Sequence, residues 1–266
     1  MSSVARVRGI ELAYTDEGSG PVVLMLHGFP FDRSMWRGQV ERLSSSFRVI
    51  APDLRGHGGT IVTDGPSTME EMAEDVSALL DELNVPHAVL CGLSMGGYVA
   101  LALYRAHPER VRALVLADTR PQADTEEARR AREENARRAL SEGMQPIADA
   151  MLPKLLSTRT RESAPEVVMR VREMMLGVDA EGAASALRGM ALRRDQTDLL
   201  SKIDVPALVI VGSEDAVTPP SDAEAMRERI EGSRLVIVEG AGHVSNIERP
   251  EEFDRALVEF LEGLPS

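Results

Sequence analysis

The sequence predicts an α/β fold in which a mostly parallel, eight-stranded sheet carries helices on both faces. Two observations predict it: short β-rich apolar runs recur along the chain, and helical patterns occupy the intervals between most of them. The runs are nearly continuous in apolar residues, which is typical of strands covered on both faces. Strands that alternate with helices form βαβ crossovers, and these build a parallel sheet.

The expected elements follow in chain order. Strands are predicted at 22–26, 47–51, 88–91, 111–117, 207–211 and 234–238, with two weaker ones opening the chain at 5–8 and 10–15. Helices are predicted at 34–43, 69–83, 95–106, 221–230 and 250–261. In the second of these helices the apolar residues fall on one face at helical spacing.

The alternation breaks between Thr119 and about Thr197, where the pattern is helical throughout. We therefore expect residues 1–118 and 198–266 to form one core and residues 119–197 to form an insertion over the reactive edge of the sheet. This stretch holds Met144, Met151, Met169, Met174, Met175 and Met190. Methionine suits a surface that adapts to varied apolar ligands. Ordinary packing between helices explains the same residues equally well.

Composition excludes several classes of protein. The formal net charge is −13, with 43 acidic and 30 basic side chains, which opposes binding to nucleic acid. The arginines of residues 126–138 alternate with glutamates, as on a solvated helix face. The single Cys91 cannot form an internal disulfide. No secretory signal or membrane-spanning apolar run is recognisable, so we expect a soluble, cytoplasmic protein.

The strongest local signal is Gly92-Leu93-Ser94-Met95-Gly96, which lies between a predicted strand and a predicted helix. A serine in such a sharp turn needs small neighbours, and the turn exposes its hydroxyl above the sheet. The following helix start supplies free N–H groups and a positive dipole end. This context predicts that Ser94 is a nucleophile.

A serine nucleophile needs a base and a carboxylate that orients the base. His243 lies in a glycine-rich loop directly after the strand at 234–238, at the correct edge of the sheet, and is the predicted base. Asp215 follows the strand at 207–211 and is the predicted acid. Asp118, after the strand at 111–117, is the competing carboxylate, and Glu214 is a weaker one. The order Ser94, Asp215, His243 is the one expected for this architecture.

Two backbone N–H groups are expected to bind the oxyanion. One belongs to Met95, and the other belongs to Phe29 in the loop after the strand at 22–26. His27 is expected to hold this loop. In the loop 53–59, Asp53 and Arg55 are expected to brace backbone, because no phosphate-binding pattern is present. A metal site at this loop lacks a third ligand.

Four motifs in order resemble the α/β-hydrolase superfamily: His27-Gly-Phe-Pro, Asp53-x-Arg-Gly-His-Gly, Gly92-Leu-Ser-Met-Gly-Gly and Gly242-His243. Within it, the sequence resembles small bacterial esterases grouped with 3-oxoadipate enol-lactonases. The resemblance implies the same nucleophile, acid, base and oxyanion donors, and a helical cap at 119–197. One departure is Gly59-Thr60, where many relatives have serine. Relatives that cleave carbon–halogen bonds carry aspartate at the nucleophile position, which Ser94 excludes.

The sequence therefore predicts a hydrolase of small, apolar carboxylic esters that works through an acyl-enzyme, with no cofactor and no metal. The expected partner is a small-molecule ester or lactone. An enol-lactonase is the alternative, and its anionic substrate needs a pocket cation, for which Arg193 or Arg194 is the candidate. A ligand-binding receptor that keeps a hydrolase shell is the alternative from another class. Relatives also include perhydrolases and carbon–carbon hydrolases, so the motifs define the mechanism better than the substrate.

Overall fold

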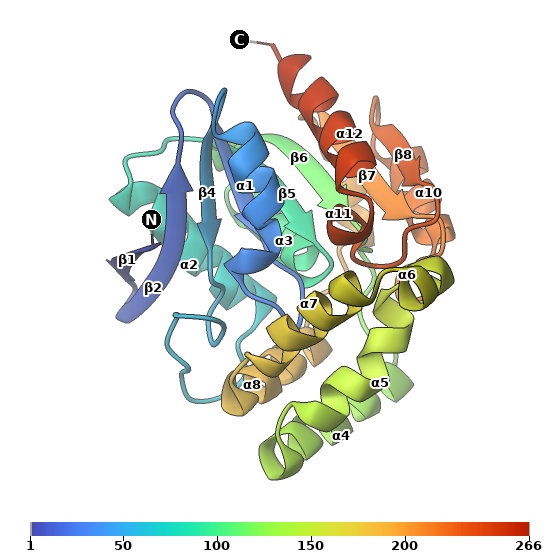
Figure 1. Ribbon diagram of the computed structural model, residues 1–266. Helices are drawn as coiled ribbons and strands as arrows, with labels where there is room; N and C mark the ends of the chain where they lie inside the picture. The colour runs from blue at the N-terminus through green and yellow to red at the C-terminus, as the bar shows by residue number, and fades with distance from the viewer. Residues whose placement is uncertain (1, 266) are drawn as a thin grey trace.

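The computed structural model describes residues 2–265 and contains one eight-stranded mixed sheet with the strand order β1-β2-β4-β3-β5-β6-β7-β8 (Figure 1). The strands are β1 (Ser2–Val7), β2 (Ile10–Glu17), β3 (Val22–Leu26), β4 (Arg48–Pro52), β5 (Ala88–Leu93), β6 (Val111–Ala117), β7 (Ala207–Gly212) and β8 (Arg234–Val238). β2 pairs antiparallel with both β1 and β4, and the remaining neighbouring strands pair parallel. The predicted fold class is confirmed.

Helices cover both faces of the sheet because side chains of each strand alternate between two apolar cores. In β3, for example, Val23 and Met25 join one core and Leu24 and Leu26 join the other. The first core includes α1 (Arg37–Leu43) and α12 (Pro250–Glu262). The second includes α2 (Met69–Glu82), α3 (Met95–Ala106) and α10 (Pro220–Arg229).

Most predicted boundaries agree with the structure to within one or two residues, and two do not. The predicted helix 34–43 is divided into a 3-10 turn η1 (Arg33–Trp36) and α1, and Asp32 caps the turn by accepting from the Ser34 N–H at 2.7 Å. β1 begins at Ser2 instead of residue 5. It is an edge strand that pairs only with β2, and its Val4 is 59% exposed, so it lacks a buried apolar run.

Six helices lie between β6 and β7 in the described residues, and the first five of them group together at one end of the sheet in Figure 1. These five are α4 (Glu126–Glu142), α5 (Gln145–Leu155), α6 (Thr158–Ser163), α7 (Pro165–Leu176) and α8 (Ala180–Ala191), which we call the inserted helices. The short α9 (Thr197–Leu200) leads back to the sheet. Of the six methionines here, Met144, Met175 and Met190 are buried, whereas Met169 is 58% exposed. Met151 and Met174 are partly buried and pack against the apolar cores, so core packing accounts for five of the six.

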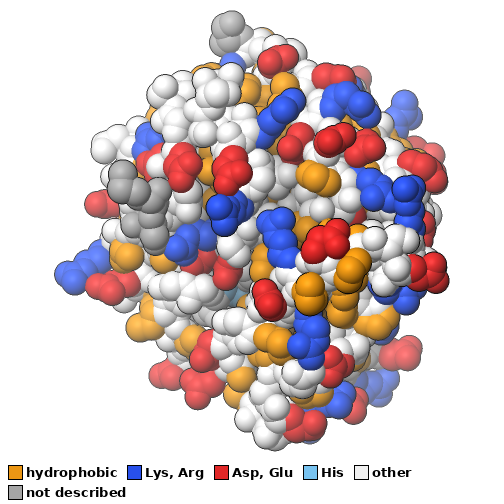
Figure 2. Space-filling model, viewed as in Figure 1, with side chains coloured by type: hydrophobic (Ala, Val, Ile, Leu, Met, Phe, Trp, Pro, Cys, Tyr) orange, Lys and Arg blue, Asp and Glu red, His pale blue; other side chains and the backbone are white. Residues whose placement is uncertain are grey.

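The arginine-rich helix α4 has a solvated face, and only Ala136 and Ala139 of the helix are buried. Arg129 pairs with Glu126 at 3.0 Å, and Arg137 pairs with Glu133 at the same distance. Figure 2 shows acidic and basic side chains interspersed over one face of the molecule. Within residues 2–265, no helix is long and apolar enough to span a bilayer.

Candidate active site

Ser94 occupies a strained turn between β5 and α3. Its φ of 54° lies in the left-handed region, which a residue with a Cβ rarely adopts. The turn requires glycine at position 92, because a Cβ there would lie 2.3 Å from the Gly96 carbonyl oxygen. Thr119 secures the turn by donating its hydroxyl to the Ser94 carbonyl at 2.8 Å. Backbone strain of this kind persists only where the surrounding structure enforces it.

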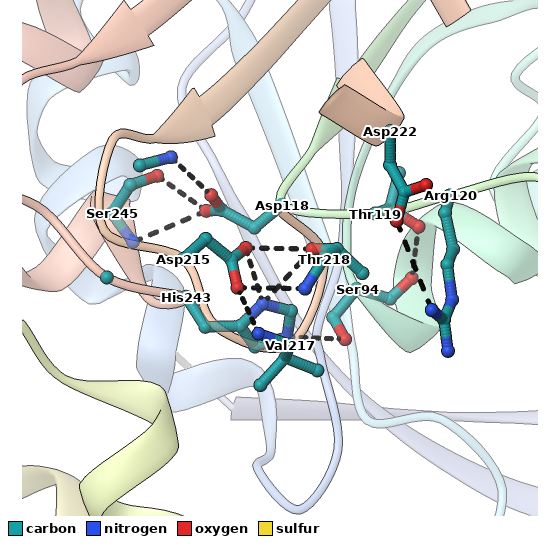
Figure 3. A network of polar contacts seen from close by, with 12 residues as sticks. Ser94, Asp118, Thr119, Arg120, Asp215, Val217, Thr218, Asp222, His243 and Ser245 are labelled. Atoms are coloured by element: carbon teal, nitrogen blue, oxygen red, sulfur yellow. Dashed lines mark hydrogen bonds and ion pairs between the residues drawn. The ribbon is translucent and has the colours of Figure 1, made fainter. Parts of the chain in front are cut away.

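His243 lies between Ser94 and Asp215, as Figure 3 shows. Its Nδ1 lies 2.8 Å from Asp215 Oδ2, and its Nε2 lies 2.8 Å from Ser94 Oγ. A carboxylate only accepts, so the ring proton is on Nδ1 and Nε2 is free to accept the serine proton. The three side chains come from loops after β5, β7 and β8 and are all buried. The arrangement can deprotonate the hydroxyl.

The acid and the base shift each other's titration. Burial by itself would lower the pKa of His243, but the Asp215 charge and its hydrogen bond raise the pKa above the ordinary value. Burial would raise the pKa of Asp215, and the charge and hydrogen bond of His243 lower it instead. The site therefore favours an ionised carboxylate beside an imidazole that binds a proton readily.

Thr218, which is not among the residues predicted from the sequence, also supports this carboxylate. Its hydroxyl donates to Asp215 Oδ2 at 2.7 Å, and its N–H donates to Oδ1 at 2.9 Å. The Val217 N–H donates to the same Oδ1 at 2.8 Å. A threonine three residues after an aspartate is a common local turn, so the spacing Asp215-x-x-Thr218 was the available signal.

Asp118, the competing carboxylate, lies close by but binds other groups. Its Oδ1 accepts from the Gly212 N–H at 2.9 Å, and its Oδ2 accepts from the Ser245 hydroxyl at 2.5 Å. Burial, followed by the nearby Asp215 charge, raises the pKa of Asp118 to about 8. Glu214 points to the inserted helices, where it accepts from the Thr158 N–H. Of the three candidates, only Asp215 has a hydrogen bond to His243.

The two expected oxyanion donors belong to segments next to Ser94. Met95 is the first residue of α3, so its N–H has no acceptor four residues earlier in that helix. The Gly28 carbonyl accepts from Phe31 N–H at 3.1 Å and lies 2.9 Å from His27 Nδ1. Because a peptide is planar and trans, fixing this carbonyl directs the Phe29 N–H to the opposite side. An added Cβ on Gly28 would come within 3.4 Å of Ser94 Cβ, so the loop adjoins the nucleophile.

The loop 53–59 is structural. Asp53 accepts from the backbone N–H groups of Arg33 and Gly59, as expected, and also pairs with the Arg33 guanidinium. Arg55 differs from the prediction: it binds the Asp75 carboxylate of α2 at 2.7 Å instead of backbone, and this pairing satisfies two side chains that are both buried. The Thr60 hydroxyl donates to the Asp53 carbonyl at 2.8 Å, so the Gly59-Thr60 departure serves this loop.

The other four histidines bind other groups or face solvent. His27 accepts from the Leu54 N–H through Nε2 at 2.9 Å, and burial lowers its pKa to about 4. Burial, followed by the charge of His27, lowers the pKa of His57 to about 3. His87 is exposed, and His107 pairs with Glu74 at 2.9 Å. Among residues 2–265 no cluster of three or more His, Cys, Asp or Glu could hold a metal.

A surface cavity of about 660 Å³ opens beside η1 and α1 and is lined by Asp32, Arg33 and Asp53 among others. None of its lining residues belongs to the Ser94–His243–Asp215 group. The lining is charged, and Arg37 and Glu41 form an ion pair within it at 3.0 Å. This cavity therefore does not define the reactive site.

The fold and this side-chain arrangement together define a hydrolase with a serine at the strand–helix turn. Residues 21–250 match the family described as "alpha/beta hydrolase fold", and the chain belongs to that family.

Solved structures and curated relatives agree. A thermophilic esterase from Thermogutta terrifontis, solved with malate bound, shares 43% identity over the whole of both chains with a TM-score of 0.97. The enol-lactonase from Burkholderia xenovorans shares 36% identity over 98% of this chain and 100% of its own, with a TM-score of 0.91. The 3-oxoadipate enol-lactonase 2 of Acinetobacter baylyi is 33% identical over 89% of this chain and 87% of its own length. The expectation of an ester hydrolase resembling esterases and enol-lactonases is confirmed.

Proposed function

We propose that the protein hydrolyses small carboxylic esters through an acyl-enzyme on Ser94, with His243 as base and Asp215 as acid. The observation that carries the proposal is the unbroken hydrogen-bond chain from Ser94 Oγ through both ring nitrogens of His243 to Asp215, with 2.8 Å at each link. A hydroxyl is a weak nucleophile unless a base accepts its proton during attack. These hydrogen bonds supply that base, His243, in the required tautomer.

The reaction then follows from the geometry. Ser94 Oγ attacks the ester carbonyl carbon while Nε2 of His243 takes its proton, and the carbonyl oxygen becomes an oxyanion. The N–H groups of Phe29 and Met95 stabilise this charge, and loss of one such donor costs about 3–4 kcal/mol. His243 next protonates the departing alcohol, and a water deprotonated by the same base releases the acid from Ser94.

We assign residues 119–197 as a cap that encloses the substrate. The inserted helices are joined to the reactive loops, since the Leu155 carbonyl of α5 accepts from the His243 N–H at 2.9 Å. The partly buried Met151 packs against both apolar cores. An apolar cap excludes water and strengthens the electrostatic contacts inside the site. This arrangement favours small, apolar esters.

A lactonase for anionic substrates is the second candidate, and an arginine pair favours it. The Arg193 guanidinium lies 4.4 Å from the ring centroid of Tyr98, one helical turn after Ser94. Arg193 is buried and shares the Asp124 carboxylate with Arg132, so two cations face one anion. The surplus positive charge suits a carboxylate on the substrate. Arg194, the other candidate, is exposed and lines the same small pocket as Arg193 and Tyr98.

Replacing the nucleophile tests the proposal. Ser94→Ala is expected to lower kcat for p-nitrophenyl butyrate by about 10⁶-fold, because the acyl-enzyme cannot form. Ser141→Ala is the matched control, since Ser141 lies exposed on α4. Hydrolysis by Ser94→Ala at the rate of the unchanged protein would refute the mechanism.

The same assay separates an enzyme from a ligand-binding receptor. An enzyme releases many equivalents of p-nitrophenol per chain, whereas a receptor that retains the serine releases one at most. For the lactonase candidate, Arg193→Met is expected to lower kcat/KM for the p-nitrophenyl hemiester of succinate more than for the neutral butyrate. Equal losses on both esters would remove the second candidate.

A further inference from the structure

The loop that carries His243 is joined to the cap by a buried carboxylate. Glu248 ends the short helix α11 (Ser245–Glu248) and is only 6% exposed. Its Oε1 accepts from the Gly242 N–H at 2.6 Å. Its Oε2 accepts from the N–H of Ser157 at 2.9 Å and from the Ser157 hydroxyl at 2.8 Å. One carboxylate therefore joins the residue before His243 to the junction between α5 and α6.

Backbone contacts hold the His243 loop and the junction between α5 and α6 too close together for either to move without the other. The His243 N–H donates to the Leu155 carbonyl at 2.9 Å. A Cβ at Gly242 would lie 2.8 Å from both the Leu155 carbonyl oxygen and the Ser157 nitrogen. Such distances are shorter than real Cβ contacts, so glycine alone fits here. A displacement of the junction must carry residues 242 and 243 with it.

The loop of the acid touches the same junction. Glu214, the residue before Asp215, accepts from the Thr158 N–H at 3.1 Å through its Oε2. Residues 155–158 of the cap thus contact both loops whose side chains form the His243–Asp215 pair. Neither of these contacts belongs to the hydrogen-bond chain that performs the proposed chemistry.

We propose that Glu248 is a positioning residue that makes the placement of the His243 imidazole depend on the seating of the cap. The inference rests on the proposed function, because it concerns the base of that reaction. Removing the Glu248 acceptor leaves the buried N–H groups of Gly242 and Ser157 without a partner, which favours a shifted loop. A displacement of about 1 Å at a reacting group can lower the rate by about 10²-fold. With the cap seated, water exclusion and base alignment are achieved together.

The decisive variant is Glu248→Gln, which keeps the shape of the side chain but replaces one acceptor oxygen by a donor. We expect kcat for p-nitrophenyl butyrate to fall by about 10²-fold, with KM within about threefold of the unchanged protein. The control is Glu251→Gln, the same chemical change on the exposed side of α12, which should leave both constants unchanged. A Glu248→Gln enzyme with kcat within twofold of the unchanged protein would overturn the inference.

A second variant separates positioning from general destabilisation. Ser157→Ala removes one donor to Glu248 from the cap side, so its effect on kcat should be smaller. If both residues act through their shared hydrogen bond, the double variant is expected to have nearly the activity of Glu248→Gln alone. Losses in kcat that simply multiply would contradict the coupling.

The low-field proton resonance of the His243 Nδ1–H provides a readout besides activity. It should be present in the unchanged protein and in Glu251→Gln, and be shifted or broadened in Glu248→Gln. An unaltered resonance beside a lowered kcat would overturn the inference and leave the role of Ser94 intact. Full activity of Ser94→Ala would instead refute the proposed function itself, so the two failures are distinguishable.

Discussion

Two buried aspartates lie near His243, and their surroundings shift their pKa values in opposite directions. Asp215 receives hydrogen bonds from Val217, Thr218 and His243, and its pKa is lowered even though burial opposes this. Asp118 receives bonds from Gly212 and Ser245, and burial together with the Asp215 charge raises its pKa to about 8. Both follow a parallel strand of the same sheet, β7 and β6 respectively.

The hydrogen-bond partners of a carboxyl group at this edge of the sheet therefore decide its role. The Asp215 charge is balanced by an imidazole that becomes cationic, so ionisation is favoured. The Asp118 carboxyl has no cation of its own among its hydrogen-bond partners, and a second negative charge nearby disfavours its ionisation. We therefore infer that Asp215 supports the base and that Asp118 braces the loops around it.

Replacing the Asp215 carboxylate is expected to have the largest effect on kcat. Asp215→Asn is expected to lower kcat by about 10⁴-fold, because the amide can donate to Nδ1 and thereby stabilise the wrong tautomer of His243. Steady-state hydrolysis of p-nitrophenyl butyrate measures the effect. An Asp215→Asn enzyme that is fully active beside an inactive Asp118→Asn enzyme would show that the roles are exchanged.

An intermediate effect concerns the pH dependence of kcat/KM. The base must be neutral to accept the serine proton, and the pKa of His243 is raised by Asp215, so activity is expected to fall as the pH drops through a value above 6.5. In Asp215→Asn the two largest influences that raise the pKa of His243 are removed, and the residual activity should persist to lower pH. An acid limb that stays at the same pH in the variant would contradict this electrostatic account.

The smallest expected effect is on the Asp118 side. Asp118→Asn changes hydrogen bonds worth about 1 kcal/mol, which corresponds to about a fivefold change in kcat. The pH dependence of the free energy of unfolding should respond more clearly to this substitution. Since the folded-state pKa is raised to about 8, the native protein holds a proton that the unfolded chain releases, and stability is lost as the pH rises from about 4 through 8. Urea unfolding at pH 6 and pH 9 should show a smaller loss in Asp118→Asn, and an equal loss would refute the assignment.

Much of the fold could be predicted because it depends on local pattern. Runs such as β6 and the amphipathic α2 carry their period in consecutive residues, and the boundaries agree closely. The edge strand β1 was predicted too short, since an edge strand is only half-covered and has no continuous apolar run. The prediction for Arg55 was wrong because its partner Asp75 is twenty residues away on another element.

The sequence by itself determined the mixed sheet, the strained serine turn and the three side chains that the structure brings within hydrogen-bonding distance; their catalytic roles stay predictions. Each depends on short-range chemistry: apolar period, glycines beside Ser94, and residues that follow strands. The sequence left Asp118 open as a competing carboxylate, and the tertiary structure supplied the contact of Asp215 with the imidazole and the bond from Glu248 in the His243 segment to Ser157, 91 residues away. Those contacts form between segments whose distance and orientation no local pattern encodes, because they depend on how the inserted helices pack onto the sheet.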